Sequence, residues 1–299
     1  MPSLDPALLL WAVRSAAPGA DVTEVRGLRD GGSPWLVRLS RGGSQRSVVL
    51  RVGTDPFPLH TEVAALQLAA EHHLPAPRLL AAELADDPPV VLVEQLRGSS
   101  MIPPERPSAR LRTLGRTAAT LHAIRLEPGP ALPRRDRPIG SVDFAALRRQ
   151  HSPQPLLQEA EQRVADAPLP RAVVFVHGDL WQGNALWTGD TLNGLIDWDC
   201  AGSGHPGIDL GSLRCDAAIC FGLDAPADIQ QGWEEVAARP ATDVAYWDVV
   251  AALSTPPDMG RFPSAIAGQG RPDLTQEVLL RRRDEFLRAA LTRLDAPGG

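Results

Sequence analysis

Short runs of valine and leucine alternate with turn-forming sequences through the first third of the chain. Two of these turns, RDGGS at 29–33 and RGGSQ at 41–45, are rich in glycine and serine, which favour tight reversals. Apolar runs bounded by such turns are typical of β-strands. The pattern predicts five strands, at 21–28, 34–40, 46–53, 78–84 and 89–96. The first three would pair antiparallel, because their connections are short.

Helical patterns dominate most of the remaining chain. Segment 60–73 has neither proline nor glycine and predicts a helix with Thr61 as its N-cap. The apolar run at 7–13 predicts a short buried helix rather than a signal peptide, since no basic residue precedes it. Further helices are predicted at 109–124, 142–150, 155–166, 228–239, 243–253 and 274–294. A strand-rich first third and a helix-rich remainder indicate an α+β fold with two lobes, an N-terminal domain at 1–97 and a C-terminal domain at 98–299.

Three short strands interrupt the helical part. The sequence AVVFV at 172–176 predicts a buried strand that ends at HGDLWQGN, residues 177–184. Strands are also predicted at 185–187 and 192–196, on either side of the turn TGDT. These two strands would form a hairpin directly after the HGD sequence.

Three polar side chains fall where this hairpin could bring them to one point. Asn184 and Asp197 would project from the same open end of the hairpin, close enough to share one ion. A few oxygen ligands that leave room for phosphate are the usual way in which Mg²⁺ is held in phosphoryl-transfer sites. Asp179 lies in the preceding loop and would face the metal without binding it. That is the position for a base toward an attacking hydroxyl.

The combined sequence HGDLWQGN…IDWD…GHPGIDLGSL resembles the signature of the aminoglycoside phosphotransferase family. This family comprises antibiotic kinases and related small-molecule kinases with the protein-kinase-like fold. The resemblance implies a smaller N-terminal lobe with an antiparallel sheet and one main helix, and a larger, mostly helical C-terminal lobe. It also implies that Asp179 is the catalytic base, that Asn184 binds Mg²⁺, and that Asp197 binds Mg²⁺ and phosphate.

A kinase of this type also needs a cation on the third strand, paired with a glutamate on the next helix, to hold the inner phosphates. Arg51 in VVLRV and Glu62 in HTEVAAL have the required order and separation. All 30 basic residues of the chain are arginines, so a guanidinium has to supply this charge. The stretch LVEQLRG resembles the hinge between lobes, so the backbone of Gln95 and Leu96 is expected to hold the adenine edge.

The chain departs from the family pattern at several positions. No GxGxxG loop lies between the first two strands, so cover for the phosphates is expected from backbone amides at 30–33. His205 stands where the family commonly has aspartate. Trp181 and Gln182 replace a common HP pair inside the catalytic loop. His122 and Asp209 are expected to play packing and structural roles.

Composition and charge limit the partners. With 43% hydrophobic and 22% charged residues the chain matches a soluble globular protein, and its three cysteines lack a CxxC pair, which fits a reducing cytoplasm. The apolar runs are too short to span a bilayer. Residues 201–260 carry nine acidic groups against two arginines, in a chain of net charge −6, which argues against nucleic acid and suits a cationic acceptor. Alternatively, these carboxylates only form solvated helix faces.

The function that these features predict is an ATP- or GTP-dependent, Mg²⁺-requiring phosphotransferase that acts on a hydroxyl of a small molecule. A cationic or polyhydroxylated acceptor is expected, first an aminoglycoside or other antibiotic, and otherwise an amino alcohol or a sugar. Two other classes stay open: a catalytically silent nucleotide-binding module of the same fold, and a Mg²⁺-dependent phosphohydrolase. The protein is expected to be a monomer or a homodimer.

Overall fold

The computed structural model describes residues 3–29, 32–166, 173–260 and 262–295. The chain divides into two compact units. The first contains Met1–Arg97 together with Gly194–Asp199, and the second contains Gly98–Asn193 and Cys200–Gly299. The short segment that carries Asp197 thus belongs to the strand-rich unit, although it follows Asn193 in the chain. That residues 1–97 and 98–299 form separate domains stays a prediction.

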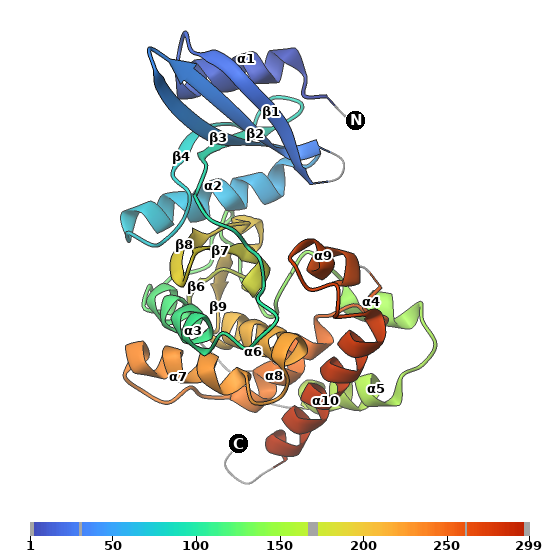
Figure 1. Ribbon diagram of the computed structural model, residues 1–299. Helices are drawn as coiled ribbons and strands as arrows, with labels where there is room; N and C mark the ends of the chain where they lie inside the picture. The colour runs from blue at the N-terminus through green and yellow to red at the C-terminus, as the bar shows by residue number, and fades with distance from the viewer. Residues whose placement is uncertain (1–2, 30–31, 167–172, 261, 296–299) are drawn as a thin grey trace. The chain divides into compact units, whose positions relative to one another are not determined.

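The first unit is built on a five-stranded antiparallel sheet with the order β1-β2-β3-β5-β4 (Figure 1). Its strands are β1 (Asp21–Arg29), β2 (Gly32–Arg41), β3 (Ser44–Val52), β4 (Leu79–Glu83) and β5 (Val90–Glu94). The ends of all five lie within one or two residues of the ranges expected from the apolar runs. Val48 and Leu50 on β3 are fully buried in the cluster beneath α1 (Pro6–Ala16). Because side chains alternate along a strand, Arg51 points to the opposite face of the sheet.

Helix α2 (Pro56–Glu71) follows β3 and starts earlier than the sequence pattern predicts. The Asp55 side chain accepts a hydrogen bond from the Phe57 amide and caps the helix, with Pro56 in the first turn. The prediction of Thr61 as the N-cap is therefore wrong. Thr61 lies inside the helix and is fully buried. Proline at positions 56 and 58 concealed the true start, because proline is tolerated in the first helical turn but not farther in.

The second unit is mostly helical. Its helices are α3 (Ser108–His122), α4 (Phe144–Arg149), α5 (Pro155–Asp166), α6 (Gly207–Phe221), α7 (Pro226–Ala237), α8 (Val244–Leu253), α9 (Phe262–Gly268) and α10 (Gln276–Leu294). One large core contains side chains from α5, α6, α8 and α10, among them Leu157, Ala218, Val249 and Phe286. The three cysteines are buried, and two of them, Cys215 and Cys220, belong to this core.

Short strands lie between α5 and α6 in the chain. Strand β6 (Val174–Val176) pairs antiparallel with β9 (Gly202–Gly204), and β7 (Ala185–Thr188) pairs with β8 (Thr191–Leu195). Residue 172, the expected first residue of the strand before HGD, lies outside the described part of the chain. The antiparallel sheet with one main helix and the helical remainder confirm the predicted α+β, kinase-like fold class. Within the described residues, no helix is both long and apolar enough to cross a membrane.

Candidate active site

The loop that carries Asp179 is held in place by hydrogen bonds to a buried carboxylate, that of Asp209. Asp209, in the first turn of α6, is completely buried and accepts hydrogen bonds from the amides of His177 and Gly178, each at 2.8 Å. It also accepts a hydrogen bond from His122 Nε2 at 3.1 Å. Burial alone raises the pKa of Asp209, but these hydrogen bonds and nearby histidines outweigh it and keep that pKa below its ordinary value. The structural role expected of Asp209 agrees with these contacts.

His122 completes this support. While its Nε2 donates to Asp209, its Nδ1 accepts a hydrogen bond from Trp233 Nε1 at 2.9 Å. Both ring nitrogens are thus satisfied in a buried site, which agrees with the predicted packing role. Gly178 has a φ of 80°, and a Cβ at this position would lie 2.0 Å from the Cys200 carbonyl oxygen. Only glycine fits directly before Asp179.

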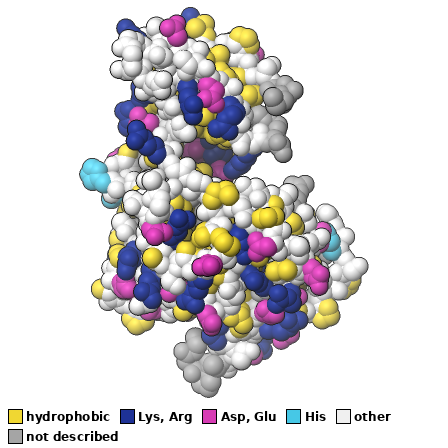
Figure 2. Space-filling model, in the orientation of Figure 1, with side chains coloured by type: hydrophobic (Ala, Val, Ile, Leu, Met, Phe, Trp, Pro, Cys, Tyr) yellow, Lys and Arg dark blue, Asp and Glu magenta, His cyan; other side chains and the backbone are white. Residues whose placement is uncertain are grey.

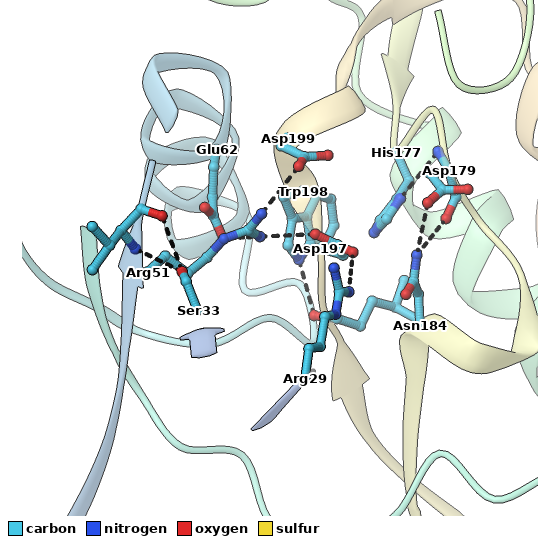
Figure 3. Close-up of polar contacts among 12 residues, drawn as sticks. Arg29, Ser33, Arg51, Glu62, His177, Asp179, Asn184, Asp197, Trp198 and Asp199 are labelled. Atoms are coloured by element: carbon cyan, nitrogen blue, oxygen red, sulfur yellow. Dashed lines mark hydrogen bonds and ion pairs between the residues drawn. The ribbon is translucent and has the colours of Figure 1, made fainter. Parts of the chain in front are cut away.

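The loop holds Asp179 and Asn184 against each other (Figure 3). Asn184 lies in the short 3₁₀ helix η1 (Gln182–Asn184), and its Nδ2 donates to the Asp179 carbonyl oxygen at 2.9 Å and to Asp179 Oδ2 at 3.2 Å. The residue is 3% exposed, so its orientation is fixed by packing as well as by these bonds. Because Nδ2 makes both contacts, the carbonyl oxygen Oδ1 is the atom of Asn184 suited to a metal ligand.

The strand-rich unit contains a second polar cluster, centred on Arg51 (Figure 3). Arg51 Nη1 lies 3.0 Å from Glu62 Oε1 and 2.8 Å from Asp197 Oδ1, and its Nη2 lies 3.0 Å from Asp199 Oδ2. The Arg51–Glu62 contact links β3 to α2, as the sequence order suggests. Asp199 was not expected to bind this arginine. A further guanidinium, Arg29 at the end of β1, donates to Asp197 Oδ2 at 2.8 Å.

The charges in this cluster shift each other's pKa. Burial lowers the pKa of Arg51, but the carboxylates of Glu62, Asp197 and Asp199 raise it more, so the guanidinium stays charged. Burial raises the pKa of Glu62 to about 7 against the opposing effect of Arg51. For Asp197, burial alone would raise the pKa, whereas Arg51 and Arg29 together hold it below the ordinary value. Asp197 is therefore an ionised carboxylate placed opposite positive charge.

The backbone at Asp197 has an unusual conformation. Its φ is 68°, in the left-handed region that aspartate tolerates better than most residues. Trp198, which follows it, is fully buried and donates from Nε1 to the Leu195 carbonyl oxygen at 2.9 Å. The anchored tryptophan holds the turn that presents Asp197.

The other residues expected to contact the nucleotide are Gln95 and Leu96, which follow β5, and segment 30–33. The Gln95 amide donates to the Ser47 carbonyl oxygen at 3.1 Å, which continues the β3–β5 pairing. This amide is therefore engaged within the sheet, and that the backbone of Gln95 and Leu96 holds the adenine edge stays a prediction. Of the expected phosphate-covering segment 30–33, residues 30 and 31 lie outside the described part of the chain. The hydroxyl of Ser33 is bonded to both the amide and the carbonyl of Val52.

Several carboxylates of residues 201–260 have arginine partners in the same unit. Asp228 contacts Arg106 at 2.6 Å and Arg112 at 3.4 Å, and the fully buried Asp248 contacts Arg214 and Arg293. Figure 2 likewise shows basic and acidic side chains intermixed over the face of this unit that it draws. The count along the sequence therefore overstated the free negative charge, because several of the neutralising arginines, such as Arg106, Arg112 and Arg293, lie outside 201–260.

Gln182, one of the two departures from the family pattern inside the catalytic loop, packs inward. Its amide and its side-chain Nε2 both donate to Asp216 Oδ2, at 3.2 and 2.7 Å, and the side chain is 6% exposed. The other departure, Trp181, packs against the large helical core. Both residues anchor the loop to the core, which no sequence signal indicated.

A family model described as the phosphotransferase enzyme family matches residues 24–250, which is most of the chain. The chain belongs to this family. The membership confirms the resemblance drawn from the HGD and IDWD sequences. No protein of curated function matches the sequence significantly.

Solved structures of this fold include several antibiotic phosphotransferases. An aminoglycoside-3'-phosphotransferase of type VIII shares 24% identity over 81% of this chain and 96% of its own, with a TM-score of 0.57. A macrolide 2'-phosphotransferase from Brachybacterium faecium shares 18% identity over 99% and 100%, with a TM-score of 0.62. A thermostable mutant of aminoglycoside phosphotransferase APH(4)-Ia, crystallised with AMP-PNP and hygromycin B, shares 16% identity over 90% and 95%, with a TM-score of 0.57. At these identities the likeness establishes the fold.

Each predicted Mg²⁺ donor, one in each unit, is chemically suited to the ion, and that the two bind it together stays a prediction. No three His, Cys, Asp or Glu side chains within the described ranges form a ready-made metal centre. The predicted donors are instead one carboxylate, Asp197, and one carboxamide, Asn184. Asp197 is ionised and already faces cations, and the bonds of Asn184 leave its carbonyl oxygen as the ligand atom. Oxygen donors in small number, completed by water and phosphate, match the preference of Mg²⁺.

His205, where the family commonly has aspartate, gives a prediction about acid stability. Its ring stacks on Trp247 with centroids 4.9 Å apart, and its Nδ1 accepts a hydrogen bond from the Gly207 amide at 2.9 Å. Burial lowers the pKa of His205 from 6.5 to about 4. The unfolded chain therefore binds this proton more readily, so the free energy of unfolding should decrease as the pH falls from 6.5 to about 4. Urea unfolding at several pH values measures this, and the decrease should be smaller in His205→Asn, which keeps an acceptor for Gly207. An equal decrease in both proteins would contradict the assignment.

Proposed function

We propose that the protein transfers the terminal phosphate of ATP or GTP to a hydroxyl group of a small molecule, with Mg²⁺ bound by Asn184 and Asp197. The observation that carries the proposal is the arginine cluster of the first unit, in which Arg51 is bonded to Glu62 and Asp197. A buried guanidinium fixed in this way is suited to the inner phosphates of a nucleotide. A phosphohydrolase that used the same carboxylates would not need it.

Each residue has a defined task in this reaction. Arg51, oriented by Glu62, binds the inner phosphates, and the backbone near Gln95 and Leu96 holds the adenine edge. Asp179 accepts the proton of the acceptor hydroxyl while its bonds with Asn184 keep it in position. Bound Mg²⁺ would neutralise the charge on the phosphates. In phosphoryl transfer most of the catalysis comes from positioning and charge stabilisation, so no further covalent chemistry is required of the protein.

The acceptor that we propose is an aminoglycoside or another antibiotic, and enzymatic modification would then confer resistance. Related folds bind such compounds, as the complex of APH(4)-Ia with hygromycin B illustrates. An amino alcohol or a sugar is the alternative. The pairing of the acidic side chains at 201–260 weakens the argument from charge for a strongly cationic acceptor, so a polyhydroxylated compound of modest charge fits equally well.

A screen of acceptors tests the proposal. Consumption of ATP and GTP is measured with Mg²⁺ and a panel of aminoglycosides, macrolides, amino alcohols and neutral sugars. We expect nucleotide turnover that depends on at least one acceptor, and a product heavier by one phosphate in mass spectrometry. Turnover with no acceptor requirement would favour the phosphohydrolase. Nucleotide binding without any turnover would favour the silent module.

The same screen, repeated at low and high ionic strength, tests the role of charge. Because several of the acidic groups at 201–260 are paired with arginines, we expect kcat/KM for the best acceptor to change little with salt. A steep decrease with added salt would indicate that an acidic surface attracts the acceptor after all. Expression of the protein in an antibiotic-sensitive bacterium, with Asp179→Asn as the inactive control, tests resistance directly.

A further inference from the structure

The carboxylate of Asp197 has a guanidinium at each of its two oxygens (Figure 3). Arg51 contacts Oδ1 and Arg29 contacts Oδ2, both at 2.8 Å. The two arginines differ in exposure and in the number of carboxylates that they contact. The Arg51 side chain is 18% exposed and is also bonded to Glu62 and Asp199, whereas the Arg29 side chain is 61% exposed. The second guanidinium is therefore the easier one to remove from Asp197.

A metal ion bound to Asp197 would conflict with this arrangement. A divalent cation at a carboxylate oxygen would lie within a few ångströms of both guanidinium charges, and like charges at such distances repel strongly. One arginine then has to move. An ion pair to an exposed side chain contributes little stability, whereas the breaking of a buried one leaves uncompensated charge. Arg29 is the residue that can move at low cost.

The position of Arg29 determines what it can reach after it leaves Asp197. It is the last residue of β1 and pairs with Gly32 at the start of β2, so it directly precedes segment 30–33, whose backbone amides are expected to cover the phosphates. At the other end of this segment, the Ser33 hydroxyl is already bonded to both backbone groups of Val52. Arg29 brings a positive charge to this end of β1, and a guanidinium can bind two phosphate oxygens at once.

We propose that Arg29 is a nucleotide-binding residue that exchanges Asp197 for the terminal phosphates when Mg²⁺ and nucleotide bind. The proposal rests on the proposed function. In the free protein Arg29 serves as a counter-ion that keeps Asp197 charged and in place. In the complex it releases Oδ2 of Asp197 and takes part of the negative charge of the β- and γ-phosphates. The sequence between β1 and β2 has no GxGxxG pattern, and in this proposal Arg29 contacts the phosphates that a glycine-rich loop would otherwise cover.

Calorimetric titration of Arg29→Ala tests the exchange. Two ligands are compared: AMP-PNP with Mg²⁺, and AMP, which lacks the β- and γ-phosphates. We expect the variant to bind AMP-PNP–Mg²⁺ about tenfold more weakly, as for the loss of one charge-assisted hydrogen-bond pair, and AMP as tightly as the unaltered protein does. Arg29→Lys should recover part of the loss, because a point charge still reaches phosphate.

Arg26→Ala is the matched control. Arg26 lies on the same strand, its side chain is 58% exposed, and it contacts Glu24. We expect this variant to bind both ligands normally, and both alanine variants to unfold at the same temperature as the unaltered protein.

The outcomes separate the two proposals. If the unaltered protein binds AMP-PNP–Mg²⁺ and Arg29→Ala binds it equally well or more tightly, Arg29 is only a partner of Asp197 and the exchange is refuted. An equal loss of affinity for AMP and AMP-PNP would likewise show that Arg29 does not contact the terminal phosphates. If the unaltered protein binds neither AMP-PNP nor the corresponding GTP analogue with Mg²⁺, the proposed function fails, and the proposal for Arg29 fails with it.

Discussion

Replacement of Asp179 by asparagine is expected to lower kcat by about 10²–10⁴-fold, the usual contribution of a general base, while nucleotide affinity changes little. Asparagine has the same shape, and its carbonyl oxygen can still accept the hydrogen bond from Asn184 Nδ2. The loop should therefore keep its conformation, because its support comes from Asp209 beneath His177 and Gly178. What the variant loses is the negative charge that accepts the proton of the acceptor hydroxyl.

Steady-state kinetics with the best acceptor and calorimetry with AMP-PNP–Mg²⁺ measure the two parts of this prediction separately. Asp190→Asn is the matched control, because Asp190 lies in the exposed turn between β7 and β8, and its side chain is 79% exposed and contacts Arg110. It should retain normal turnover. If Asp179→Asn kept more than a few per cent of the activity, the role of Asp179 as the base would be refuted, whereas a large loss of nucleotide affinity would move Asp179 into the metal site.

The sequence predicted the sheet well because its strands are defined by local pattern. The apolar run of β5 is continuous, that of β3 is broken only by Arg51, and their bounding turns contain glycine, serine or proline. Element type is reliable where periodicity and turn signals agree. The start of α2 was misplaced because the sequence has prolines in the first turn, and α9 was not predicted because a seven-residue helix that contains proline and ends in glycine has almost no periodic signal.

The candidate site was predictable to the extent that its residues lie in fixed-spacing motifs. Asp179, Asn184 and Asp197 come from two short stretches, and Arg51 and Glu62 follow from the order of a strand and the next helix. Neither a motif nor the order of the elements points to Arg29. It is one of 30 arginines, and its contact with Asp197 joins residues 168 positions apart in the chain. Only the folded sheet brings the end of β1 to that carboxylate.

Charge was the least predictable property. The excess of carboxylates at 201–260 looked like an acidic surface, but the partners of Asp228 are arginines at 106 and 112, and Asp248 is bonded to Arg293. Ion pairs between distant segments do not appear in a local count of charges. The same limitation applies to Asp199, which contacts Arg51 across 148 positions of sequence.

Replacement of Arg51 by alanine should weaken nucleotide binding and catalysis together. Glu62, Asp197 and Asp199 would lose a shared counter-ion in a partly buried site, and the inner phosphates would lose their guanidinium. We expect kcat/KM to fall by about 10²–10³-fold, which corresponds to several kcal/mol of lost transition-state stabilisation. The free energy of unfolding should also fall, by about 2–4 kcal/mol, since the breaking of a largely buried ion pair leaves uncompensated carboxylates. Kinetics, calorimetry with AMP-PNP–Mg²⁺ and urea unfolding measure these three quantities.

Two comparisons separate the loss of phosphate contact from the loss of stability. Arg51→Lys keeps a positive charge between the carboxylates and should retain partial activity, although an ammonium cannot bind two oxygens in the fixed geometry of a guanidinium. Arg46→Ala removes another arginine of β3, which contacts the Ala16 carbonyl oxygen and Glu94, and should leave nucleotide affinity unchanged. If Arg51→Ala bound nucleotide and turned over normally, the cluster of Arg51, Glu62 and Asp197 would be a structural ion-pair network. The nucleotide phosphates would then have to bind elsewhere, and the proposal for Arg29, which depends on Asp197, would lose its basis.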